Sequence, residues 1–166
     1  NLVARGLVAP GFGLLFLALT AIATAFYTSG EAGAVAIVAA AAIGAYMALN
    51  IGANDVANNV GPAVGARAMT MLGALVIAAI FEAAGALIAG GDVVETISSG
   101  IVSPASIPDA ATFIRLMIAA LVYSALWINL ATLIGAPVST THSVVGGVLG
   151  AAVAAAGFAA VDWPVI

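Results

Sequence analysis

Long runs of apolar residues with little or no charge constrain this chain more than any other feature. Five such runs follow one another along the sequence: residues 7–28, 34–53, 69–90, 110–135 and 143–160. The first, second and fifth carry no charge, the third carries only Glu82, and the fourth carries only Arg115. A helix needs about 20 apolar residues to cross a hydrocarbon core of roughly 30 Å. The sequence therefore predicts four helices that cross a membrane fully and a fifth of marginal length.

Composition excludes most other classes of protein. Hydrophobic residues make up 64% of the chain and charged residues 6%, against roughly 45–50% and 25% in soluble domains. Three Arg and no Lys cannot form a basic surface for nucleic acid. The absence of cysteine excludes disulfides and Cys-ligated metals. We expect an all-α integral membrane protein, a polytopic helical bundle in contact with lipid, that forms a single membrane domain over residues 1–166.

Residues 50–62 place an unusual number of polar groups beside an apolar run. The segment holds four Asn, Asp55, two Gly and Pro62. On a helix, Asn54 and Asn58 would share one face, because they are four residues apart. An acid within a span costs about 2.5–3.5 kcal/mol on insertion scales, and such groups usually mark an ion or substrate path. The pattern predicts a broken helix that lines such a path; a helix end followed by a polar loop is the alternative.

Residues 135–143, with the sequence GAPVSTTHS, form a second polar interruption. Pro137 cannot continue the preceding helix, and Ser139 or Thr140 can cap the next one. The helix that follows is short, so we expect a re-entrant or discontinuous helical hairpin with a hydroxyl-rich tip. Free N–H groups at a helix start, together with hydroxyls, can bind an anion. An ordinary capped turn at the surface is the alternative.

Two further residues carry chemistry. Glu82 lies in the middle of an apolar run, where a carboxylate needs a proton, a cation or a hydrogen-bond donor; a protonated Glu bonded to a neighbouring carbonyl is the structural alternative. His142 is the only histidine, and a lone His cannot form a zinc site. It is expected to be a hydrogen-bonded part of the tip. A membrane hydrolase lacks support because no GxSxG motif is present, so we expect no enzyme. A passive channel or structural subunit would not explain two separate polar segments.

The polar segments resemble a known family. Residues 52–58, GANDVAN, resemble the signature of the inorganic phosphate transporter (Pho4/PiT) family. The resemblance continues in order and spacing over about residues 43–163, through segments 64–70, 81–85, 94–97, 100–102 and 135–143. Asn59 departs from it, since the family usually has a small residue there. The resemblance implies a secondary active transporter of inorganic phosphate, a symporter driven by Na⁺ or, in some members, by H⁺. A sulfate or other oxyanion permease of the same family is the alternative.

The resemblance also implies an architecture. The family is built from two inverted repeats, each with one GANDVAN-like motif and one STTHS-like hairpin, and this chain shows one of each. We therefore expect the N-terminal repeat of a longer protein, with the second, C-terminal repeat missing from this chain, in a prokaryotic inner (plasma) membrane. A homodimer is a further expected assembly.

The same resemblance supports seven site positions. They are Asn54, Asp55, Asn58, Glu82, Ser139, Thr140 and Thr141. A phosphate near acids in a low dielectric is strongly repelled unless a cation accompanies it. We expect phosphate to bind at Ser139, Thr140, Thr141, Asn54 and Asn58. The coupling cation is expected at Asn54, Asp55, Asn58 and Glu82, with Na⁺ itself on Asp55 and Asn58. No resident cofactor is expected, only co-transported Na⁺ or H⁺.

Overall fold

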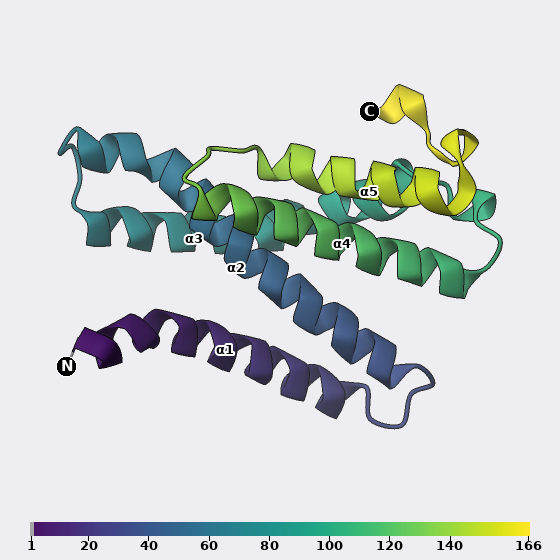
Figure 1. Ribbon diagram of the computed structural model, residues 1–166, viewed down its shortest axis with the longest axis horizontal. Helices are drawn as coiled ribbons and strands as arrows, with labels where there is room; N and C mark the ends of the chain where they lie inside the picture. The colour runs from purple at the N-terminus through teal and green to yellow at the C-terminus, as the bar shows by residue number, and fades with distance from the viewer. Residues whose placement is uncertain (1) are drawn as a thin grey trace. The chain divides into compact units, whose positions relative to one another are not determined.

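The computed structural model describes residues 2–166, and the side chains of residues 7–103 and 105–166. The described chain is helical almost throughout (Figure 1). Its α-helices are α1 (Leu2–Tyr27), α2 (Ala34–Gly65), α3 (Met71–Glu95), α4 (Ala110–Leu133) and α5 (Thr140–Ala156). Shorter turns are a π-helix η1 (Thr96–Gly100) and the 3₁₀ turns η2 (Pro104–Ser106), η3 (Phe158–Ala160) and η4 (Trp163–Val165).

Four helical segments are long and apolar enough to cross a membrane: Leu7–Tyr27, Ala34–Gly65, Met71–Gly100 and Ala110–Leu133. Helix α5 is apolar but only 17 residues long. The structure therefore has the four long apolar helices and the shorter fifth one that the apolar runs predicted. Many large apolar side chains point outward; Leu87 and Ile88 of α3, for example, are 88% and 85% exposed. Such surfaces are stable in lipid or against other helices, not in water.

The Asn-rich segment does not break its helix, contrary to our expectation. Helix α2 runs without interruption from Ala34 to Gly65 and includes all of residues 50–62. Pro62 lies in the last turn of the helix, where its missing N–H removes one bond of the backbone ladder but does not end the helix. The helix ends beyond it, where Arg67 adopts a left-handed φ of 58°, a common way to close a helix.

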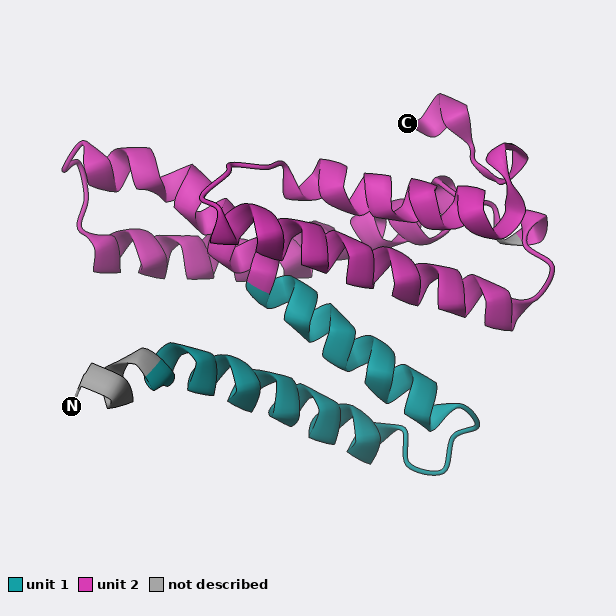
Figure 2. Cartoon of the chain, viewed as in Figure 1, with its two compact units in different colours: residues 1–49 teal, residues 50–166 magenta. Residues whose placement is uncertain are grey.

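The chain divides into two compact units, residues 1–49 and residues 50–166 (Figure 2). The division falls within α2, so the polar end of that helix belongs to the same unit as α3, α4 and α5. In the first unit, a Cβ added to Gly13 of α1 would lie 3.7 Å from Leu49 of α2, which is ordinary packing contact. All of the predicted site residues fall in the second unit.

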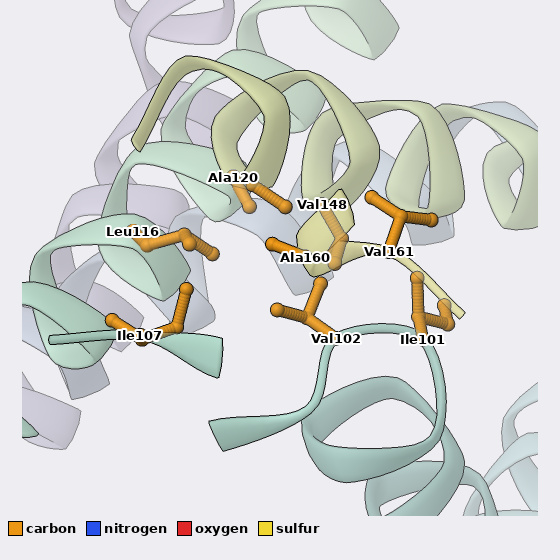
Figure 3. Packing of buried hydrophobic residues seen from close by; sticks show 9 residues of the cluster. Ile101, Val102, Ile107, Leu116, Ala120, Val148, Ala160 and Val161 are labelled. Carbon is orange, nitrogen blue, oxygen red and sulfur yellow. The ribbon is translucent and has the colours of Figure 1, made fainter. Parts of the chain in front are cut away.

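Helices α4 and α5 pack against each other more extensively than any other pair. Their contact continues into an apolar core that the connections on either side complete (Figure 3). The residues of this core come from the segment before α4, from both helices and from the segment after α5: Ile101, Val102, Ile107, Leu116, Ala120, Val148, Ala152, Ala160 and Val161. Val102 and Val161 form an isolated antiparallel bridge, and Asp162 donates its N–H to Ile101 O at 2.9 Å. This core holds α4 and α5 together at the end opposite their connecting turn.

Helix α5 approaches the backbone of α4 closely at Gly147. A Cβ there would lie 2.8 Å from Ala120 O and would also collide with Ser124 Oγ. The sequence contains small residues at four-residue spacing, such as Gly146 and Gly150, which predict close helix packing. Within the described residues, however, nothing lies within 4 Å of a Cβ added at either position. The contact residue is one position away from the predicted pair, because the rotation of α5 about its axis selects the face.

Candidate functional site

The connection between α4 and α5 is a capped hairpin turn. Helix α4 ends at Leu133, Gly135 takes a left-handed φ of 70°, and Pro137 lies between the helices. Ser139 caps α5: its Oγ accepts the N–H of His142 at 3.2 Å. The His142 Nδ1 also lies 2.6 Å from this oxygen. The predicted cap and the predicted hydrogen-bonded role of His142 are both confirmed, and Ser139 rather than Thr140 is the cap.

The polar face of α2 packs against the last turns of α4 through side-chain hydrogen bonds. Asn129 Nδ2 donates to Asn50 Oδ1 at 2.8 Å, and Asn54 Nδ2 donates to Thr132 Oγ1 at 3.1 Å. Asn54 also accepts from Asn58 Nδ2 on its own helix, at 3.0 Å. Asn50 and Asn54 are each only 6% exposed. Buried amides are therefore paired across the two helices, as buried polar groups must be.

Asp55 is joined to the start of α5. Thr140 Oγ1 donates to Asp55 Oδ2 at 2.7 Å, across 85 positions in sequence. Thr140 is 6% exposed and Asp55 is half-buried. The partner that the structure gives this carboxylate is thus a hydroxyl, not a basic side chain.

A cavity of about 340 Å³ lies beside these contacts. Its lining comes from α2 and from the end of α4 with the turn that follows: Ala53, Asn54, Ala57, Asn58, Thr132, Gly135, Ala136 and Pro137. Asn58 is exposed and Asn54 is buried. The two predicted polar segments therefore meet at one cavity, although their order along the chain did not require it.

Among the predicted site residues, only Asn54 and Asn58 line this cavity. Asp55 and Thr140 bond to each other, and Glu82 and Thr141 take part in neither arrangement. Glu82 is exposed on α3, and the described part of the chain gives its carboxylate no hydrogen bond. Thr141 is exposed and lines a different cavity of about 420 Å³, together with Asp92, Thr96 and His142. The structure thus brings together Asn54, Asp55, Asn58 and Thr140, with Ser139 adjacent in the turn.

Sequence reasoning missed Asn129 and Thr132, which hold the Asn-rich face. A signal for them was present, because both are polar residues in an otherwise apolar run and lie three apart, on one face of a helix. Asn50 was part of the Asn-rich segment but was not selected as a site residue. The sequence does not show which residues of α2 lie opposite which residues of α4, and this register decides that Asn129 and Thr132 meet the Asn-rich face.

Comparison with known proteins confirms the resemblance. Residues 51–166 match the phosphate transporter family. The chain is 57% identical over 150 residues to a "Putative phosphate permease" of Helicobacter pylori, over 90% of this chain and 28% of that protein. It is 46% identical over 121 residues to a similarly described permease of Thermococcus kodakarensis, over 73% of this chain and 30% of that protein.

A solved structure shows the same likeness in three dimensions. The protein described as "The sodium-dependent phosphate transporter" superimposes with a TM-score of 0.74 at 41% identity, over 79% of this chain and 32% of that one. This chain therefore spans about three tenths of the length of the relatives that it matches. The hydrolase alternative is excluded, because the match is to a family of transporters and not of enzymes. Since the match covers most of its length, this chain belongs to the phosphate transporter family.

Proposed function

We propose that this chain is the N-terminal repeat of a two-repeat secondary active transporter, which carries inorganic phosphate in symport with Na⁺ across a prokaryotic inner membrane. It contains one Asn-rich segment and one hydroxyl-capped hairpin, and it spans 28% of the Helicobacter pylori relative. The remaining length of such a protein has room for a second repeat and further segments. Inverted-repeat transporters place their sites where two such halves face each other.

The observation that carries the proposal is the pairing of Asp55 with Thr140. Phosphate carries one to two negative charges, and two unit charges 4 Å apart repel by about 4 kcal/mol even at an effective dielectric of 20. Phosphate cannot approach the hairpin beside Asp55 unless a cation offsets this repulsion. Coupling to a cation then follows from charge balance at one site.

Thr140 supplies a physical link between the two ions. Its hydroxyl has one proton, and Thr140 donates that proton to Asp55 Oδ2. The hydroxyl is therefore unable to donate to a phosphate oxygen until it releases Asp55. A Na⁺ ion on the carboxylate weakens its hold on the hydroxyl proton, which frees Thr140 to bind phosphate with Ser139. We therefore expect Na⁺ to bind before phosphate.

The remaining assignments complete the proposal. Asn58 and Asp55 offer oxygen ligands to Na⁺, while Ser139 and the start of α5 face the anion. Thr141, in the first turn of α5, is the remaining proposed phosphate ligand, although in this structure it lines a separate cavity. Glu82 acts in coupling with a partner from the second repeat, because a carboxylate exposed in the middle of a membrane span is costly by itself.

The test is uptake of radioactive phosphate by the full-length protein in liposomes. An inward Na⁺ gradient is expected to drive saturable accumulation, whereas a K⁺ gradient is not. Asp55→Asn keeps the shape of the side chain but removes its charge, so coupled uptake is lost while the yield of folded protein is kept. Glu31→Gln, in the turn after α1, is the matched control and leaves uptake unchanged.

Three other outcomes would each contradict part of the proposal. Uptake that follows a pH gradient in the absence of Na⁺ assigns coupling to H⁺. If sulfate accumulates and competes for uptake more strongly than phosphate does, the substrate is sulfate rather than phosphate. Flux that neither saturates nor depends on a cation gradient indicates a passive channel.

A further inference from the structure

We propose that Thr132 is a positioning residue that orients the side-chain amides of Asn54 and Asn58, so that Asn58 presents its carbonyl oxygen as a ligand for the coupling cation. This inference rests on the proposed function and deepens it. It concerns a residue outside the Asn-rich segment, on α4, where the sequence shows only an apolar run interrupted by occasional polar positions.

The argument begins with the proton of Thr132. Its Oγ1 donates to Ile128 O, one turn back on the same helix, at 2.8 Å. A hydroxyl has a single proton, so Thr132 has only lone pairs left for Asn54. Asn54 must therefore turn its NH₂ group toward Thr132, and the Nδ2 to Oγ1 distance is 3.1 Å.

The orientation then passes along α2. With its Nδ2 used by Thr132, Asn54 has its Oδ1 on the opposite side, where it accepts from Asn58 Nδ2 at 3.0 Å. Asn58 in turn has its own Oδ1 left as the acceptor at the end of the chain of bonds. Asn58, Asn54 and Thr132 all line the same cavity of about 340 Å³. The end of this chain of bonds is thus an oxygen, the ligand that Na⁺ prefers to a nitrogen donor.

If the side-chain amides of Asn54 and Asn58 were both reversed, the site would attract an anion instead of a cation. If Asn54 turned over, its Oδ1 would face the lone pairs of Thr132 and its Nδ2 would face Asn58, which would have to turn over too. Asn58 would then present N–H groups, which suit an anion. Asn54 is 6% exposed, so water cannot easily satisfy it in the reversed orientation. One hydroxyl on α4 therefore selects a cation ligand on α2.

The experiment compares Thr132→Val with Thr132→Ser in the full-length protein. Valine keeps the shape but removes the acceptor, whereas serine keeps the hydroxyl. Binding of ²²Na⁺ to purified protein without phosphate is measured first. Valine is expected to raise the Na⁺ concentration for half-saturation roughly 5- to 150-fold, the range for one buried polar group left without its partner. Serine is expected to stay within about twofold of the wild type.

A matched control removes the same kind of backbone bond elsewhere. Thr24 Oγ1 on α1 donates to Thr20 O at 2.8 Å, so Thr24→Val loses a similar bond. This threonine orients no asparagine side chain, and Na⁺ binding is therefore expected to stay unchanged. Phosphate KM at saturating Na⁺ is measured in liposomes for the same variants. It is expected to change by less than about twofold in Thr132→Val. Thr132→Ala, which also lacks the acceptor, replaces the valine variant if that variant does not fold.

The outcomes separate this inference from the proposed function. Normal Na⁺ binding by Thr132→Val, an equal loss in Thr132→Ser, or an equal shift in phosphate KM overturns the role of Thr132. Absence of Na⁺ binding by the wild type overturns it as well. The wild type could bind Na⁺ without accumulating phosphate, and this result would refute the proposed function. If Thr132→Val then binds Na⁺ more weakly than that wild type, the inference about Thr132 is still supported.

Discussion

Replacement of Gly147 by alanine tests the close packing that holds the hairpin in place. The new Cβ would lie 2.8 Å from Ala120 O, at least 0.6 Å inside the 3.4 Å at which ordinary contact begins. Ala120 O is backbone and cannot turn away. Ser124 would also have to move, although its Oγ is bonded to Ala120 O at 2.7 Å and to Ser143 O at 2.9 Å.

The cost of this change follows from its two parts. Overpacking of a well-packed contact costs about 1–3 kcal/mol, and loss of the Ser124 hydrogen bonds adds about 1 kcal/mol. A total of about 2–4 kcal/mol lowers Tm by roughly 4–16 °C in a chain of 150–250 residues, and by less in a longer protein. Because Ser143 and Thr140 share the start of α5, phosphate uptake is expected to fall as well.

The assay is thermal unfolding of the purified full-length protein in detergent. Gly146→Ala is the matched control, because nothing described lies within 4 Å of its added Cβ, and alanine favours a helix by about 1 kcal/mol over glycine. Its Tm is expected to stay level or rise. Ser124→Ala combined with Gly147→Ala is expected to recover part of the loss. A Gly147→Ala protein that unfolds at the same temperature as Gly146→Ala would refute the packing described here.

Three further predictions concern coupling, pH and assembly. Glu82→Gln is expected to abolish Na⁺-driven phosphate uptake with normal yield of folded protein, and uptake at the wild-type rate would remove Glu82 from the mechanism. Asp109 caps α4, and bonds from the side chain and then the backbone N–H of Thr112 hold the pKa of this carboxyl below its usual value. The stability that this carboxylate contributes is therefore present above the unfolded pKa of about 3.9 and is lost as pH falls through the lower folded value. Asn at position 109 can still cap the helix but does not titrate, so Asp109→Asn is expected to reduce the dependence of Tm on pH in this range. An unchanged slope of Tm against pH would contradict this effect. Residues 1–166 alone in liposomes are expected not to accumulate phosphate, because one repeat supplies only half of the gates; saturable Na⁺-driven accumulation at the rate of the longer protein would instead indicate two copies in inverted orientation.

The sequence by itself determined the membrane spans and the hairpin cap. Transfer of a helix into lipid is close to a sum over its residues, so the runs could be located without knowledge of their neighbours. The cap of α5 is equally local, because Ser139 needs only the N–H of His142, three residues ahead. The resemblance to the phosphate transporter family was also readable from short segments in order, and it supplied the candidate site residues before any contact was known.

Tertiary structure decided how those segments meet. Asn50 and Asn54 lie within the continuous helix α2, and across the helices they bond to Asn129 and Thr132, nearly 80 positions away. Asp55 finds its donor 85 positions along the chain. Register and rotation of one helix against another arise from the packing of whole surfaces, so no local pattern encodes them. The same reason explains why Gly147, and not its neighbour Gly146, lies against the backbone of α4.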